Sequence, residues 1–203
     1  MSRVLKMKSF SGLALLLFCG LALAKAKVGE PAPSFSVINA QGQTVSLADY
    51  SGQRVVLEWT NDGCPFVQKH YNSGNMQGLQ QLAAEQDTLW FTVISSAPGK
   101  QGHKDGAAAK AMIAAWKASP DAVLLDDSGD VGRAYGAKTT PHMYIIDAEG
   151  VLRYAGGIDD IPTANTADIA RAENYVRNAM NALARGEPVA DAITRPYGCS
   201  IKY

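Results

Sequence analysis

The chain has 203 residues, a length that fits one domain with an ordinary hydrophobic core. Its 19 Lys and Arg residues balance 19 Asp and Glu residues, so no basic stripe indicates a nucleic-acid partner. Composition and charge therefore leave two classes open, a small enzyme and a protein-binding domain.

The first 24 residues are typical of an export signal. Their features are three early basic residues, an apolar run over 13–23, and an Ala-Leu-Ala cleavage pattern over 22–24. The run is shorter than the ~17–25 residues that cross a bilayer, although an uncleaved anchor is the alternative. We expect cleavage after Ala24, or otherwise after Ala26.

Removal of this segment takes away three basic residues and no acidic ones, leaving 16 against 19. The expected mature domain, 25–203, is periplasmic or secreted and has no stable membrane association. Two cysteines remain in it, Cys64 and Cys199. An even pair of cysteines in an exported chain permits a disulfide.

Apolar runs and helical periodicities alternate along the mature chain. In order they predict a hairpin over 35–38 and 44–47, a strand over 55–59, a helix from 65 interrupted near 72–74, a strand over 89–94, a helix over 107–118, a strand over 123–125, a helical turn over 130–135, a hairpin over 142–146 and 151–155, and a helix over 166–185. Alternating elements of this kind predict an α/β fold, with helices on both faces of a sheet and a tail after the last helix.

Cys64 is the foremost candidate for chemistry. It follows the strand over 55–59 and directly precedes Pro65, a residue favoured at the first position of a helix. A thiol there faces unpaired amides and the positive end of the helix, which lowers its pKa. Reactive groups in such sheets lie beyond the carboxyl ends of strands, where Cys64 is placed. A small buried cysteine at a strand–helix junction is the alternative.

The strand, the Cys-Pro start of a helix, and the later Thr139-Thr140-Pro141 before an edge strand resemble a known family over about 28–185. It is the exported redoxin type of thioredoxin-like protein, which includes the alkyl hydroperoxide reductase/thiol-specific antioxidant proteins. The resemblance implies a thioredoxin-like fold with a central mixed sheet flanked by helices. It also implies that Pro141 is cis and lies with Thr140 against Cys64.

The chain departs from this family at two positions. Asn61 stands where thioredoxins carry the first cysteine of Cys-x-x-Cys and where peroxiredoxins carry Thr. Peroxiredoxins place an arginine where Pro141 aligns, and Arg133 or Lys138 are the candidates to replace it. A local dithiol is therefore absent, and a relative without redox activity is an alternative.

Cys199 is the candidate second thiol. A lone reactive cysteine oxidises to a sulfenic acid, which a second thiol resolves. The last helix, at ~1.5 Å per residue, is expected to span ~30 Å, and the tail over 186–199 extends ~40 Å, far enough to return to Cys64. A static disulfide and a free tail thiol are the alternatives.

Three other polar residues have two interpretations each, and a fourth has one. Glu58 either points inward with a raised pKa or faces outward, and Asp62 either opposes the thiolate or caps the helix. His142 either lies near Cys64 or, as we expect, faces solvent at the start of its strand. His103 is expected in a solvated loop.

These residues predict an exported thiol oxidoreductase with Cys64 as nucleophile, Cys199 as resolving cysteine, and Thr140 and Pro141 at the site. Its substrate is a protein disulfide or a small hydroperoxide, and its reduction needs an external electron donor. No cofactor and no metal site is predicted. The alternative is a redox-inactive binding protein of the same fold, taking a partner or Cu(I) through Cys64, Cys199 and a histidine.

Overall fold

The computed structural model describes residues 25–203, so the expected export signal and its cleavage after Ala24 lie outside the described residues. Across these 179 positions, no helix combines the length and the apolar character that a membrane span requires.

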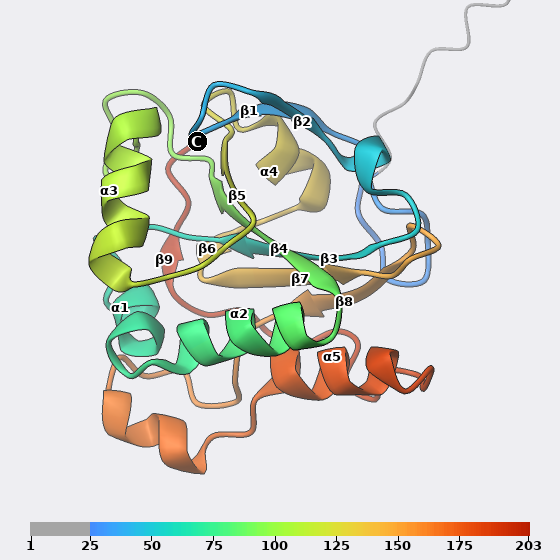
Figure 1. Cartoon of the computed structure of the whole chain (residues 1–203). Helices are drawn as coiled ribbons and strands as arrows, with labels where there is room; N and C mark the ends of the chain where they lie inside the picture. The colour runs from blue at the N-terminus through green and yellow to red at the C-terminus, as the bar shows by residue number, and fades with distance from the viewer. Residues whose placement is uncertain (1–24) are drawn as a thin grey trace, which may run out of the picture.

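Seven strands form one mixed sheet in the order β2-β1-β5-β4-β3-β7-β8 (Figure 1). Their bounds are β1 Ser36–Asn39, β2 Thr44–Ser46, β3 Arg54–Trp59, β4 Thr88–Ile94, β5 Ala122–Leu125, β7 His142–Ile146 and β8 Leu152–Gly156. Strands β3, β4 and β5 are parallel, whereas the two hairpins and the β3–β7 and β1–β5 pairs are antiparallel. The predicted strands and hairpins, and the α/β class, are confirmed.

Two short strands lie outside this sheet and pair with each other. They are β6, Thr139–Thr140, and β9, Cys199–Ser200, which run antiparallel. The C-terminal tail thus returns to the segment that precedes β7, and its red trace in Figure 1 passes beside β6.

The helices cover both faces of the sheet. Their bounds are α1 Pro65–Asn72, α2 Asn75–Glu85, α3 Gly106–Trp116, α4 Asp130–Tyr135 and α5 Tyr175–Ala184, with 3-10 turns η1 Leu47–Tyr50 and η2 Thr166–Arg171. In Figure 1, α1, α2 and α5 lie on one side of the sheet and α4 on the other. The break predicted near 72–74 separates α1 from α2.

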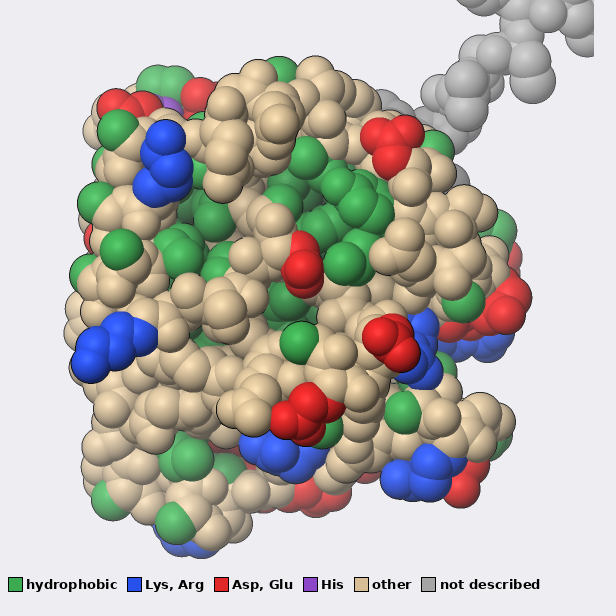
Figure 2. Space-filling view, viewed as in Figure 1, with side chains coloured by type: hydrophobic (Ala, Val, Ile, Leu, Met, Phe, Trp, Pro, Cys, Tyr) green, Lys and Arg blue, Asp and Glu red, His purple; other side chains and the backbone are tan. Residues whose placement is uncertain are grey.

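Alternation along β3 builds a hydrophobic core on each face. Val56 packs with the α1, α2 and α5 side, whereas Leu57 and Trp59 belong to the opposite cluster with Tyr135 and Tyr144. The Trp59 ring lies 5.1 Å from the Tyr144 ring in an edge-to-face arrangement. Figure 2 shows hydrophobic side chains in a hollow beside the β1–β2 hairpin.

The helix predicted over 166–185 is wrong in its length. The structure has η2 and α5 instead, separated by 172–174. The Asn174 side chain accepts the amide of Arg177 and so starts a new helix, a competition with the backbone that asparagine makes well. Helix α5 has 10 residues and spans ~15 Å. The tail therefore has a shorter distance to cover than expected.

Candidate active site

Cys64 lies at the carboxyl end of β3, at the N-cap of α1. The turn before it is held by Asn61, whose side-chain oxygen accepts the Gly63 amide at 2.9 Å and whose carbonyl accepts the Cys64 amide at 3.0 Å. The Cys64 side chain is completely buried. Asn61, which occupies the position of a first cysteine, thus shapes the turn that sets the Cys64 backbone.

The Thr140–Pro141 peptide is cis, as the resemblance implied. The Cys64 thiol donates to the carbonyl oxygen of Thr140 at 3.0 Å. Cys64, Thr140 and Pro141 therefore meet in space, although 76 residues separate Cys64 from Thr140.

The tail brings Cys199 to the same point. In the β6–β9 pair Thr140 is opposite Cys199, and the Cys199 amide donates to the Cys64 sulfur at 3.4 Å. Gly198 has φ of +135°, and a Cβ on it would overlap the Thr140 carbonyl. The approach of β9 to β6 therefore requires glycine at this position. Both cysteines are free thiols, and Cys199 is partly exposed.

The two thiols differ in acidity. Burial by itself would raise the pKa of Cys64, but hydrogen bonds from Cys199 and from the Val67 amide outweigh it, so the Cys64 pKa is lowered. Burial and the hydrogen bond to Cys64 raise the pKa of Cys199 to about 11. Cys64 therefore loses its proton more readily than Cys199, which stays protonated at neutral pH.

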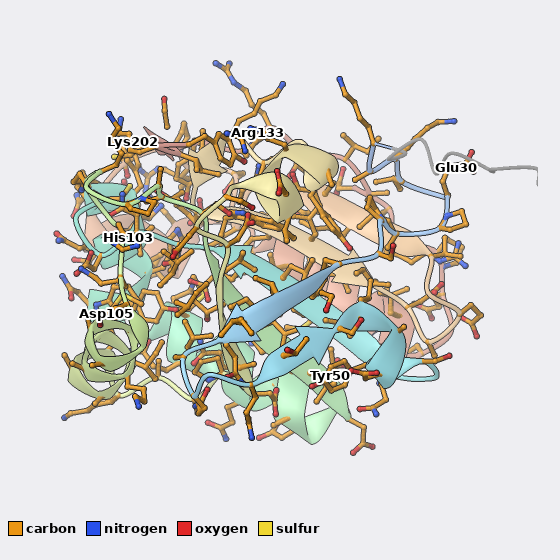
Figure 3. All side chains as sticks on the ribbon, turned by 90° about the horizontal axis from the view of Figure 1, so that it is seen from above. Glu30, Tyr50, His103, Asp105, Arg133 and Lys202 are labelled. Atoms are coloured by element: carbon orange, nitrogen blue, oxygen red, sulfur yellow. The ribbon has the colours of Figure 1, made fainter. Side chains whose placement is uncertain are left out.

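The expected arginine substitutes do not hydrogen-bond Cys64. Arg133 is exposed and lies over the Tyr203 ring, 4.8 Å from its centroid. Arg133 belongs to α4, and Figure 3 shows it on the same side of the molecule as Lys202. Lys138 is also exposed, and its backbone accepts the Ile201 amide at 3.1 Å.

Asp62 neither caps α1 nor bonds to the thiol. Its carboxylate pairs with the Lys104 ammonium at 2.8 Å, which offsets the negative charge beside Cys64. The prediction that Asp62 caps the helix is wrong, whereas its opposition to the thiolate by like charge stays a prediction, and Lys104 reduces that effect.

Glu58 points inward and is completely buried. Its carboxylate accepts hydrogen bonds from the Tyr71 hydroxyl at 2.8 Å, from the Trp90 indole at 2.9 Å and from the Thr92 hydroxyl at 3.2 Å. Burial raises its pKa to about 7, against the lowering effect of these bonds. Its bonds tie α1 to β3 and β4 and include none to Cys64.

The expectation of a solvent-facing His142 is wrong. The ring is buried against Tyr144, with centroids 4.6 Å apart, and its Nδ1 accepts the Lys138 amide at 3.3 Å. Burial, assisted by Lys138, lowers its pKa to about 3. His103 is not simply solvated, because it lies 3.3 Å from the Asp127 carboxylate.

Sequence reasoning missed a buried polar cluster between α1 and the tail. The Lys69 ammonium lies 2.9 Å from the Asp159 carboxylate and 3.3 Å from the Tyr197 hydroxyl. His70 contacts the same hydroxyl at 3.1 Å. The one available signal was the position of Tyr197, two residues before Cys199. Within residues 25–203, no group of three or more His, Cys, Asp or Glu side chains is placed to hold a metal ion.

The AhpC/TSA family model matches residues 28–155. The chain belongs to this family. Cys64, Thr140 and Pro141 fall inside the matched range, whereas Cys199 and the whole tail lie beyond it.

The names of two curated relatives refer to thiol–disulfide chemistry. The thiol-disulfide oxidoreductase ResA of Bacillus thuringiensis is 22% identical over 133 residues, covering 62% of this chain and 67% of that protein. The thiol:disulfide interchange protein DsbE of Pseudomonas fluorescens biotype C is 25% identical over 166 residues, covering 78% and 86%. The chain therefore belongs to a redoxin family that is related to thiol-disulfide oxidoreductases.

Solved structures share the thioredoxin-like fold. An uncharacterized conserved protein from Geobacillus kaustophilus matches with a TM-score of 0.72 and 26% identity, over 87% of this chain and 92% of that one. A thiol:disulfide interchange protein DsbE from Chlorobium tepidum, described as putative in its own name, matches with a TM-score of 0.53 and 23% identity, over 64% and 85%. The predicted thioredoxin-like fold is confirmed.

Proposed function

We propose that the protein is an exported thiol oxidoreductase whose redox pair is Cys64 and Cys199. The observation that carries the proposal is the position of Cys199, whose amide lies 3.4 Å from the Cys64 sulfur although 135 residues separate the two. The lowered pKa of Cys64 supports it, because thiol–disulfide exchange needs a thiolate and is fastest when the leaving thiol has a low pKa.

The substrate class is a protein disulfide rather than a hydroperoxide. Two observations favour this choice: neither Arg133 nor Lys138 binds the Cys64 sulfur, and the named curated relatives act in thiol–disulfide exchange. Cys64 is completely buried, whereas Cys199 is partly exposed, so a partner sulfur meets Cys199 first. A cavity of about 480 Å³ beside the tail, lined in part by Thr139, Tyr197 and Gly198, offers room for a partner segment.

The first step starts from the Cys64–Cys199 disulfide and a partner dithiol, the external electron donor. A donor thiolate attacks the Cys199 sulfur, a new sulfur–sulfur bond forms, and the old bond breaks with its electron pair on Cys64. Cys64 leaves readily because its pKa is the lower of the two.

The donor's second thiolate then attacks the donor sulfur of the mixed disulfide and releases Cys199, which takes up a proton. The donor has become a disulfide and the protein a dithiol, a transfer of two electrons. To reduce the substrate, the Cys199 proton first passes to the Cys64 thiolate, and the resulting Cys199 thiolate attacks the substrate disulfide and expels one substrate thiolate. Cys64 then loses this proton to solvent, attacks the Cys199 sulfur and expels the second substrate thiolate, so each turnover passes two electrons from donor to substrate. In this scheme Cys199 is the nucleophile toward the partner, whereas the sequence predicted that role for Cys64.

A trapping experiment tests the redox pair. The protein is oxidised with glutathione disulfide, mixed briefly with glutathione, quenched with acid and mapped by mass spectrometry without reduction. We expect a Cys64–Cys199 disulfide before mixing and a glutathione adduct on Cys199 after it. Cys64→Ser and Cys199→Ser should each abolish reduction of a disulfide substrate. Free thiols throughout, or full activity in either variant, would contradict the proposal.

Export is the second part of the proposal. Intact mass of the protein from a bacterial periplasm or culture medium should match a chain that starts at Lys25, or at Lys27 for the alternative cleavage. A full-length mass in the membrane fraction would show an uncleaved anchor instead.

A further inference from the structure

A buried polar cluster joins the helix of Cys64 to the tail of Cys199. Lys69 and His70 lie on α1, five and six residues after Cys64, and Tyr197 lies two residues before Cys199. Asp159 comes from the segment after β8 and faces all three. We call these four residues the tail latch.

The latch holds one of the most deeply buried ion pairs among the described residues. The exposed fractions of the Lys69 and Asp159 side chains are 0% and 1%. Besides Asp159, the Lys69 ammonium donates to the Ile161 carbonyl at 2.8 Å and to the Tyr197 hydroxyl at 3.3 Å, so all three of its protons have acceptors. A buried pair is tolerated only with such complete bonding, because an unpaired buried charge is strongly destabilising.

Tyr197 completes this arrangement from the tail. Its hydroxyl donates to the Asp159 carboxylate and faces the His70 Nε2 at 3.1 Å. The Asn75 amide lies 2.8 Å from the His70 Nδ1, which makes Nδ1 the acceptor and leaves the proton on Nε2. Burial lowers the His70 pKa to about 4, so the ring is neutral at pH 7 and donates to Tyr197.

The short backbone segment between Tyr197 and Cys199 couples the positions of the two residues. Gly198 is fitted against the Thr140 carbonyl, and Cys199 pairs with Thr140 in the β6–β9 ladder. Cys199 is therefore fixed from two sides, by the latch two residues earlier and by β6 beside it. The Phe66 ring adds an edge-to-face contact to Tyr197, with centroids 5.8 Å apart.

We propose that the tail latch is a positioning device for the redox reaction: it holds Cys199 at Cys64 and so sets the effective concentration of one thiol at the other. This inference rests on the proposed function. None of the four residues touches either sulfur, so they act through Tyr197 and the tail backbone.

Tyr197→Phe is the test variant, because it removes one hydroxyl and keeps both the ring and the Lys69–Asp159 pair. Tyr50→Phe is the matched control, since among the described residues the Tyr50 hydroxyl makes no hydrogen bond and Tyr50 lies in η1, outside the cavity beside the tail. Each protein is equilibrated in glutathione buffers at pH 7, quenched with acid, and the ratio of Cys64–Cys199 disulfide to glutathione mixed disulfide is measured at fixed glutathione. Circular dichroism and melting temperature establish that each variant is folded.

We expect this ratio to fall about tenfold in Tyr197→Phe, as for loss of a hydrogen bond to a charged group, and to stay unchanged in Tyr50→Phe. A purely structural role would lower the melting temperature and leave the ratio of the folded protein unchanged, which would overturn the latch alone. A wild-type chain that forms no Cys64–Cys199 disulfide would overturn the proposed function, and with it the latch.

Discussion

Cys64 owes its acidity to a second cysteine as well as to the start of a helix. Burial alone would raise its pKa, and hydrogen bonds from the Cys199 side chain and amide are the largest effects that lower it, ahead of the Val67 amide of α1. The start of the helix therefore accounts for only part of the lowered pKa of Cys64.

Cys199→Ala should therefore raise the Cys64 pKa. The variant loses the side-chain donor, and the remaining burial favours the neutral thiol. The midpoint of pH-dependent alkylation measures the change, because the midpoint is independent of how fast the reagent reaches the sulfur. Cys199→Ser, which keeps a donor, should shift the midpoint less. Equal midpoints in all three proteins would show that Cys199 does not stabilise the thiolate.

Gly198 is a second residue whose role is local and steric. Gly198→Ala places a Cβ on the Thr140 carbonyl and should lower the unfolding free energy by about 2 kcal/mol or undock β9. Gly186→Ala is the control, since Gly186 also has positive φ but open space around it, and should cost about 1 kcal/mol. Urea unfolding measures the stability of both variants, and the rate of Cys64 alkylation reports whether β9 has undocked. A Gly198→Ala protein as stable as wild type, with Cys64 alkylated as slowly, would contradict the predicted overlap.

At the scale of elements, α1 is the part that connects the site to the rest of the molecule. Cys64 stands at its start, Lys69 and His70 reach the tail latch, and Tyr71 donates to Glu58 of β3. Tyr71 also stacks on Trp116 of α3, with centroids 3.8 Å apart. One short helix thus fixes the position of Cys64 through contacts on several sides.

The Glu58 carboxylate should make the stability of this junction depend on pH. Its folded pKa of about 7 lies above its ordinary value of 4.5, so the native state binds the proton more tightly than the unfolded state. The contribution of Glu58 to the unfolding free energy is therefore greatest below about pH 4.5. It falls, by up to about 3 kcal/mol, as the pH rises to about 7.

Glu58→Gln should remove this dependence. Urea unfolding at pH 5 and pH 8 should show a smaller loss of stability in the variant than in wild type. The exposed Glu85→Gln is the matched control and should keep the wild-type difference. A Glu58→Gln protein with the full wild-type difference would place the titrating group elsewhere.

At the scale of the whole molecule, the last eight residues close over the site. After β9 the tail continues to the loop after β4, where the Ala97 amide donates to the Lys202 carbonyl at 2.8 Å. It ends with the Tyr203 hydroxyl on the Ala137 carbonyl at 2.7 Å. Cys64 is therefore covered by a segment that is no part of the seven-stranded sheet.

Deleting 196–203 should leave the sheet folded and uncover Cys64. The two-stranded β6–β9 ladder and the Tyr197 contacts are lost, but every strand of the main sheet keeps its partners. We expect far-UV circular dichroism close to wild type, a lower melting temperature, and faster alkylation of Cys64. Alkylation no faster than in the full chain would show that the tail does not control access to the sulfur.

The sequence by itself determined the elements and one half of the site. Apolar runs record local burial, so β3, β4, β7 and the start of α1 were predictable, and the Cys-Pro and Thr-Thr-Pro motifs located Cys64 and Pro141. Such patterns describe each segment alone. They do not say which way Glu58 points, or that a helix predicted over 166–185 breaks at Asn174.

Only the tertiary structure decided the other half. The pairing of Cys199 with Thr140, and the burial of Lys69 against Asp159, join segments 59 and 90 residues apart. Cys199 was predicted as the second thiol because the tail is long enough to return to Cys64. Neither that length nor a lysine inside a helix identifies Thr140 or Asp159 as the partner, because the partner is set by the path of the whole chain. Burial of these groups is stable only where the fold supplies every hydrogen bond they lose from water, and that supply is a property of the folded molecule.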